Sequence, residues 1–162
     1  MTTIDQQIEA MAERWPGFKI VDQGPSHVEW HGILAPDKRK HLVRVKHRIP
    51  MAIENLTLHD AQPRVQVLNP LLERHPDYDE GPIPHVYWSR SDAAAEPYLC
   101  LFSPTLREWD INDLIADTTI HWAAQWLYFY EGWLVTKKWL GGGRHITSQD
   151  GEKRLESTPA PI

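Results

Sequence analysis

The stretch LVRVKHRI, residues 42–49, decides the fold because its side chains alternate strictly. One set of positions holds Val43, Val45, His47 and Ile49, and the other set holds Arg44, Lys46 and Arg48. A period of two is typical of a β-strand that buries one face and exposes the other. We therefore predict a half-buried strand over these residues.

Similar extended segments lie on both sides of this strand, at residues 18–23, 28–34 and 64–68. The connections at 24–26 and 35–38 contain the Gly, Pro, Ser and Asp residues that favour tight turns. Short turns join strands that run antiparallel to each other. The sequence therefore predicts a four-stranded antiparallel meander.

Two helices are predicted to flank these strands. The first spans Thr3–Trp15, with an apolar stripe made of Ile4, Ile8, Met11, Ala12 and Trp15. The second begins near Asp110, whose carboxylate suits a helix N-terminus, and ends near Lys137. Its buried side is formed by Ile115, Trp122, Trp126, Phe129 and Trp133. This order of elements predicts an α+β domain with the C-terminal helix packed on the sheet.

The chain has 162 residues, which is about the length of one domain. We place that domain at residues 1–146. Residues 147–162 are polar and contain proline, so we expect a disordered tail there.

Composition excludes several classes of protein. With 17 basic and 22 acidic residues, the net charge is 17 − 22 = −5, which argues against a general binder of nucleic acid or anionic membrane. The N-terminal residues lack the pattern of a signal peptide, and no stretch has the length of a membrane span. The single cysteine, Cys100, allows no internal disulfide. We expect a soluble, cytoplasmic protein.

A long proline-rich segment, 69–97, precedes the only cysteine. Loops of this length are often functional, which favours an exposed thiol at Cys100. The alternative is that Cys100, between Leu99 and Leu101, is a small buried apolar residue. His85 is the nearest upstream histidine and is placed to polarise the sulfur, or else it packs on Trp88.

Other polar motifs do not carry a prediction of chemistry. The residues His75-Pro76-Asp77 lie among charges and are interpreted as a solvated turn. The strand histidines are predicted not to form a metal site; they are His27, His31, His41 and His47. Residues 141–143, three glycines, lack the flanking residues of a phosphate loop. We predict no cofactor and no metal.

Several motifs together resemble a known family. They are Ile83-Pro84-His85, Leu99-Cys100-Leu101, Trp109 and the long helix that follows. Their order resembles the ubiquitin-conjugating enzyme fold. The stretch from Ile83 to Gly143 is similar, more specifically, to stand-alone ubiquitin-conjugating-like proteins of type II (short) CBASS antiphage operons.

The resemblance implies that Cys100 is a catalytic cysteine that carries an acyl group as a thioester and passes it to a lysine amine of a target protein. The acyl group would be the C-terminal glycine of a cGAS-like CD-NTase, which the transfer primes for antiviral defence. The chain contains no adenylating domain, so a separate activating enzyme or another activated tail is implied.

The sequence departs from the family at one position. The family's His-Pro-Asn element contributes an asparagine to the oxyanion, but no asparagine occurs between Asn69 and Asn112. The candidates to replace it are His85, Tyr87 and backbone amides near Cys100. Trp109 is a candidate for supporting the loop.

Two other functions stay open at this point. One is a non-catalytic module of the same fold that binds and regulates the CD-NTase. The other, from a different enzyme class, is a Cys–His amide hydrolase with Cys100 as nucleophile and His85 as base, which would need a lowered thiol pKa.

Overall fold

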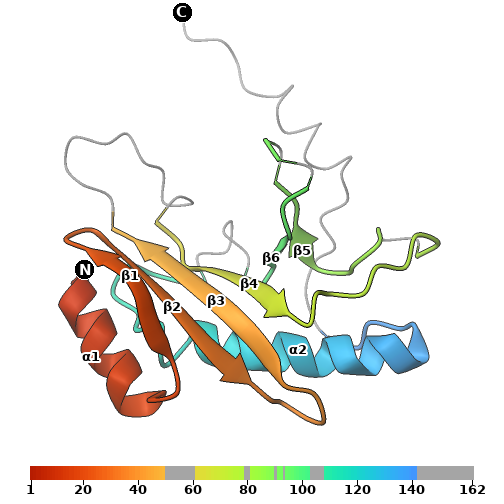
Figure 1. Cartoon of the computed structure of the whole chain (residues 1–162), viewed down its shortest axis with the longest axis horizontal. Helices are drawn as coiled ribbons and strands as arrows, with labels where there is room; N and C mark the ends of the chain where they lie inside the picture. The colour runs from red at the N-terminus through yellow and green to blue at the C-terminus, as the bar shows by residue number, and fades with distance from the viewer. Residues whose placement is uncertain (50–60, 79–80, 90, 93, 103–107, 142–162) are drawn as a thin grey trace, which may run out of the picture.

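The computed structural model describes most of the chain (Figure 1). The described residues are 1–49, 61–78, 81–89, 91–92, 94–102 and 108–141. The predicted tail, 147–162, lies outside them.

Four antiparallel strands form the main sheet in sequence order, which confirms the predicted meander. They are β1 (Lys19–Gly24), β2 (His27–Leu34), β3 (His41–Arg48) and β4 (Arg64–Asn69). In the centre of the sheet, Val45 of β3 lies opposite Trp30 of β2 and Val65 of β4. All three side chains are buried.

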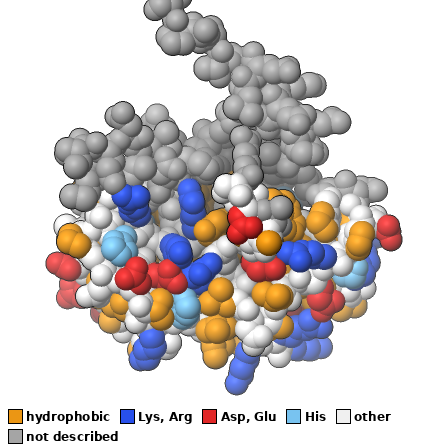
Figure 2. Space-filling model, turned by 45° about the horizontal axis from the view of Figure 1, so that its top comes forward, with side chains coloured by type: hydrophobic (Ala, Val, Ile, Leu, Met, Phe, Trp, Pro, Cys, Tyr) orange, Lys and Arg blue, Asp and Glu red, His pale blue; other side chains and the backbone are white. Residues whose placement is uncertain are grey.

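The alternation along β3 has the predicted effect. Its buried side chains are His41, Val43, Val45 and His47. Arg44 and Lys46 lie on the other face, where polar partners from β2 and β4 surround them. The sheet therefore has one apolar face and one polar face. Figure 2 shows acidic and basic side chains interspersed on the side of the molecule it presents.

The first helix, α1 (Ile4–Arg14), is also confirmed. Thr3 caps it, because its hydroxyl accepts from Gln6 N at 3.2 Å while the Gln6 side chain accepts from Thr3 N at 2.9 Å. The buried Gln7 amide donates to the carbonyl of Asp113 at 2.8 Å and accepts from Ile115 N at 2.9 Å. These bonds fasten α1 to the segment before the second helix.

The second helix, α2 (Thr119–Thr136), begins nine residues later than Asp110, so the predicted start is wrong. Asp110 instead accepts from Asn112 N at 2.9 Å, and Asp113 accepts from Asp110 N at 2.8 Å. Such local side-chain bonds give the backbone an alternative to a helix. The predicted end is confirmed, since Lys137 adopts a left-handed conformation with φ of 57°.

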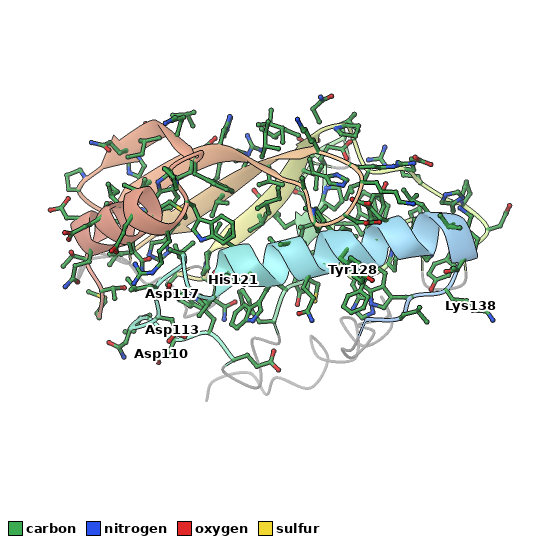
Figure 3. All side chains as sticks on the ribbon, turned by 90° about the horizontal axis from the view of Figure 1, so that it is seen from below. Asp110, Asp113, Asp117, His121, Tyr128 and Lys138 are labelled. Carbon is green, nitrogen blue, oxygen red and sulfur yellow. The ribbon has the colours of Figure 1, made fainter. Side chains whose placement is uncertain are left out.

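Helix α2 runs beneath the apolar face of the sheet (Figures 1 and 3). Trp126 and Trp133 are buried, as predicted, and Tyr130 is buried beside them. Trp122 and Phe129 are only partly buried, and the buried Ile115 lies before the helix. Figure 3 shows Tyr128 and His121 along the helix, between Asp110, Asp113 and Asp117 near one end and Lys138 near the other.

A second, two-stranded sheet was missed by the sequence analysis. It consists of β5 (Val86–Tyr87) and β6 (Tyr98–Leu99), paired antiparallel. Strands of two residues are too short to show an alternating pattern. Cys100 therefore follows a strand directly and does not end an irregular loop.

Within the described part of the chain, no helix combines the length and the apolar character of a membrane span.

The α2 core residues give a first test. Trp133 is fully buried, so Trp133→Ala should lower the free energy of unfolding by about 3–5 kcal/mol. Tyr128→Ala is the matched control, because Tyr128 lies on the same helix but is 55% exposed, and its cost should stay below about 1 kcal/mol. Urea unfolding of both variants measures the difference. Equal, small losses would contradict the packing described for α2.

His47 gives a test by pH. Burial lowers its pKa from the ordinary 6.5 to about 4. The unfolded chain therefore binds a proton as the pH falls through 6.5, whereas the folded chain does so only near 4. The stability that this neutral histidine contributes is complete above pH 6.5 and is lost as the pH falls toward 4.

Between pH 7 and pH 5, this one group should lower the free energy of unfolding by about 2 kcal/mol. In His47→Gln the corresponding part of the pH dependence should disappear, as urea unfolding at both pH values would show. His121→Gln, which removes an exposed histidine, controls for the loss of a histidine as such. An unchanged pH dependence in His47→Gln would count against a buried neutral His47.

Candidate functional site

The backbone of His85 joins the segments that form the candidate site. His85 has a left-handed backbone with φ of 51° and directly precedes β5. Its carbonyl oxygen accepts from the Cys100 amide at 3.0 Å and from the indole Nε1 of Trp126 at 2.9 Å. The predicted proximity of His85 and Cys100 is therefore present, and it is made by main-chain atoms.

The sulfur of Cys100 lies next to a phenol. Pairing of β5 with β6 places Tyr87 opposite Tyr98 and Val86 opposite Leu99. From this hairpin the thiol of Cys100 donates to the hydroxyl oxygen of Tyr87, with 3.1 Å between Sγ and Oη. Of the residues predicted near the thiol, Tyr87 is the one whose side chain bonds to the sulfur.

The environment of Cys100 favours the neutral thiol. The side chain is partly buried, and this burial is the largest cause that raises the pKa of the thiol. The hydrogen bond with Tyr87 lowers that pKa, while the negative charge of Glu108 raises it. Together these effects raise the pKa of the Cys100 thiol above its ordinary value, so the thiol is protonated at neutral pH.

The same surroundings hold the Tyr87 phenol in its protonated form. Burial raises its pKa most, and the hydrogen bond with Cys100, the negative charge of the Cys100 thiolate at high pH and the charge of Glu108 raise it further. Tyr87 is therefore a hydrogen-bond donor at neutral pH. Such a donor stabilises negative charge that develops on or beside the sulfur.

The imidazole of His85 belongs to an aromatic cluster. It stacks on Trp139 with 4.9 Å between centroids and 23° between planes. Trp139 in turn packs against Trp126 at 5.3 Å and Phe129 at 6.1 Å. The alternative partner for His85, Trp88, is instead covered by Arg74 at 5.4 Å.

Trp109 lies in the core. It is buried, and its ring meets that of His47 edge to face at 5.7 Å. It therefore packs under the end of β3, and its support of the active-site loop stays a prediction.

Two further histidines singled out in the sequence, His41 and His75, have structural partners. His75 packs edge to face on Trp133 at 4.9 Å and lies 2.9 Å from Lys137 Nζ, so it is less solvated than predicted. His41 pairs with Glu131 of α2 at 3.0 Å. Among the described residues, no group of three or more His, Cys, Asp or Glu side chains is placed to hold a metal ion.

The sequence analysis missed three residues of the site. Glu108 acts on the thiol through its charge, Trp126 fixes the His85 carbonyl, and Trp139 covers the His85 ring. Of these three residues, only Trp126 lies on a helix with a periodic apolar pattern, and that pattern predicted it as a core residue. The contact of its indole with His85 joins segments far apart in the chain, which periodicity does not reveal.

This arrangement suits a thiol that reacts with an already activated carbonyl group. A hydrolase of the Cys–His type lowers its thiol pKa with a neighbouring imidazolium. Here burial and a carboxylate raise the pKa of Cys100, so the geometry does not favour the hydrolase.

Comparison with known proteins agrees with the resemblance seen in the sequence. No curated protein matches the chain. The family described as "Type II CBASS E2 protein" matches residues 7–146, which is most of the chain. This protein therefore belongs to the type II CBASS E2 protein family.

Proposed function

We propose that this protein is a ubiquitin-conjugating-like transferase that carries an acyl group on Cys100. The observation that carries the proposal is the placement of the thiol: the His85 carbonyl holds the Cys100 backbone, and the Tyr87 hydroxyl lies 3.1 Å from Sγ. Membership in a CBASS-associated E2 family supports the same reaction class. The helix, meander and long second helix are compatible with a ubiquitin-conjugating-like fold.

The reaction consists of two acyl transfers. In the first, Cys100 Sγ attacks the carbonyl carbon of an activated C-terminal glycine, the S–C bond forms, the activating group leaves and the thiol proton passes to solvent. In the second, a neutral lysine amine attacks the thioester, the amide C–N bond forms, the S–C bond breaks, and the proton that the nitrogen loses is taken up by the departing sulfur. A raised thiol pKa is compatible with the first step because the substrate is already activated.

Tyr87 has the chemistry to replace the missing asparagine. Both transfers pass through a tetrahedral carbon bound to Sγ, whose oxygen carries the negative charge. The hydroxyl beside Sγ remains protonated, so it offers a hydrogen bond to that oxygen. A single donor of this kind typically lowers the barrier by about 3 kcal/mol.

Glu108 has a role in the second transfer. Its negative charge reaches both the thiol and the Tyr87 phenol. A carboxylate at this position attracts the cationic lysine of an acceptor protein. The donor of the acyl group is the C-terminal tail of a cGAS-like CD-NTase, and a separate activating enzyme or another activated tail supplies the energy.

A second candidate function is a binding module that regulates the CD-NTase without chemistry. The observation that favours it is the partial burial of Cys100 together with its raised thiol pKa, both of which suit an inert cysteine.

A thioester test separates these functions. The protein is co-expressed with its neighbouring operon proteins as wild type, Cys100→Ser and Cys100→Ala, and intact mass and non-reducing gels are recorded. We expect a thiol-labile adduct in the wild type, a thiol-stable ester with serine and no adduct with alanine. If all three proteins form a complex with the CD-NTase and none forms an adduct, the result would contradict the transferase and support the binding module.

The environment of the thiol is tested by the pH profile of iodoacetamide alkylation. Glu108→Gln removes a negative charge, so the pKa of Cys100 should fall and alkylation at pH 7.5 should become severalfold faster. Tyr87→Phe removes a donor to the thiolate, so the pKa should rise and alkylation should slow.

Tyr98→Phe is the control, because Tyr98 lies on β6 and its ring contacts Arg64; its profile should match the wild type. Shifts of the two test variants in one common direction would refute the assigned electrostatics.

A further inference from the structure

The hairpin that carries Cys100 needs support from outside itself. Each of β5 and β6 has two residues, and isolated two-stranded hairpins are at best marginally stable. One support is the Trp126 bond to the carbonyl of His85, at the Cys100 end of the hairpin. The other end lies beside β4 of the main sheet (Figure 1).

Gln66 of β4 makes the contact at this other end. Its Nε2 donates to the backbone carbonyl oxygen of Glu96 at 2.6 Å, and Glu96 lies two residues before β6. Gln66 alternates with the core residues Val65 and Val67, so it faces away from α2, yet it is only 3% exposed. The hydrogen bonds described for this buried side chain are with Glu96 and with Arg44.

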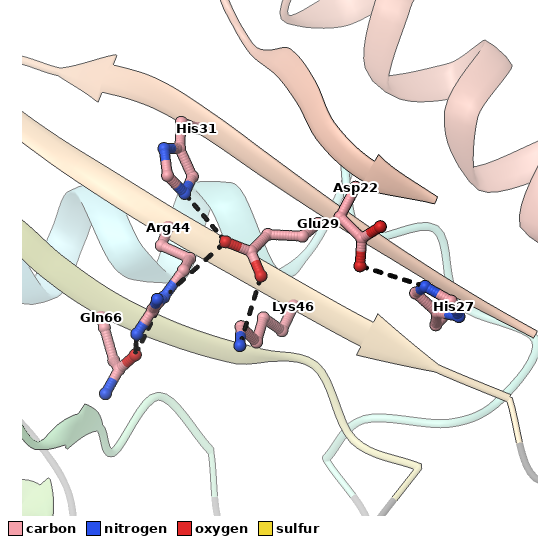
Figure 4. A network of polar contacts seen from close by, with 7 residues as sticks. All are labelled: Asp22, His27, Glu29, His31, Arg44, Lys46 and Gln66. Carbon is pink, nitrogen blue, oxygen red and sulfur yellow. Dashed lines mark hydrogen bonds and ion pairs between the residues drawn. The ribbon is translucent and has the colours of Figure 1, made fainter. Parts of the chain in front are cut away.

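The direction of the Gln66 amide is fixed by Arg44 of β3. Gln66 Oε1 accepts from Arg44 Nε at 3.1 Å and also from Nη2 (Figure 4). A reversed amide would place its NH₂ group against the guanidinium, which has no acceptor. The Gln66 NH₂ group is therefore directed at the Glu96 carbonyl.

Arg44 is itself held by a charged cluster on the same face of the sheet (Figure 4). Glu29 lies 4.0 Å from Arg44 Nε, 3.2 Å from Lys46 Nζ and 2.9 Å from His31 Nε2. Burial alone would raise the pKa of Glu29, but hydrogen bonds from His31 and Lys46 and the charges of Lys46 and Arg44 lower it. Glu29 is thus ionised, and it holds Arg44 in place.

A parallel contact follows the same route from β4 to β6. The guanidinium of Arg64 lies 5.5 Å from the centroid of the Tyr98 ring. This cation–π contact is less directional than a hydrogen bond, because the guanidinium can shift across the face of the ring. Gln66 supplies a directional bond from β4 to the segment entering β6.

We propose that Gln66 is a positioning residue for Cys100. Its amide fixes the position of Glu96 relative to the main sheet. Because β6 connects Glu96 to Cys100, this bond also fixes the position of the thiol and its contact with Tyr87. This role rests on the proposed acyl transfer, in which the sulfur must meet the carbonyl carbon in a defined orientation.

Two variants isolate the donor group. Gln66→Glu keeps the acceptor for Arg44 and loses the NH₂ group, whereas Gln66→Met keeps the length and loses both polar groups. Asp22→Asn is the control, because it removes a charge from the same face, where the Asp22 carboxylate pairs with His27 and not with Glu29, Arg44 or Gln66. Cys100 alkylation by iodoacetamide and amide hydrogen exchange, followed by mass spectrometry, are measured well below the unfolding temperature.

In both Gln66 variants, we expect iodoacetamide to alkylate Cys100 about tenfold faster than in the wild type. The loss of one hydrogen bond makes local opening of the hairpin more frequent by about this factor. Exchange at residues 98–100 should accelerate with it, while exchange in β2 and β3 stays unchanged. Asp22→Asn should remain within about twofold of the wild type. Loss of the Glu96 contact exposes the thiol, which is why reactivity rises.

Two results would overturn the proposal. Alkylation at the wild-type rate in both variants would show that the bond does not position Cys100. Exchange that accelerates equally in β2, β3 and β6 would show a general effect on stability. Alkylation needs no thioester, so a failure of the proposed function, seen as no adduct on Cys100, is distinguishable from a failure of the role of Gln66.

Discussion

The candidate site depends on one backbone atom, the carbonyl oxygen of His85. It accepts from the amide of Cys100 and from the indole of Trp126, so it joins the hairpin to the helix beneath the sheet. The two donors occupy both lone pairs of this carbonyl, so its hydrogen-bonding capacity is fully used. The left-handed backbone of His85 is unusual for a residue other than glycine, and these bonds and the stacking on Trp139 hold it there.

The Trp126 bond in turn requires that α2 is held in one orientation about its own axis, so that the Trp126 indole faces the His85 carbonyl. Apolar side chains surround much of this helix, so burial alone would tolerate several rotations. Two polar contacts remove this freedom: Glu131 pairs with the buried His41 of β3, and the Tyr130 hydroxyl accepts from Glu73 N at 2.7 Å. A buried pair of this kind contributes more to a unique geometry than to net stability. The orientation of Trp126, and with it the His85 carbonyl, follows from these contacts.

The predictable parts of the fold are those with a repeating pattern. The four strands of the meander and α1 were predicted to within one or two residues, because alternation and a capping threonine are local features. The start of α2 was not, since Asp110 and Asp113 use their carboxylates in turns. Strands β5 and β6 are too short to show a pattern. For the site, the sequence named Cys100 and His85 together, but the contact described between them is made by main-chain atoms and not by the imidazole. The charge of Glu108, the cover of Trp139 and the role of the Trp126 indole arise from contacts across the fold.

The surroundings of Cys100 also bear on which chemistry the site can perform. A thiolate formed in advance would be open to oxidation and to adventitious electrophiles, whereas burial and Glu108 raise the pKa of Cys100, and a neutral thiol suits the proposed transfer from an activated carbonyl. In the proposed reaction the proton leaves as the sulfur is acylated, and in the later transfer the sulfur is the leaving group, so the thiol pKa then acts on the departure of the sulfur. The negative charge then moves to the carbonyl oxygen, where the protonated Tyr87 hydroxyl is a better partner than a second carboxylate. The arrangement therefore suits a carrier that waits for a loaded donor more than an enzyme that must activate its own nucleophile.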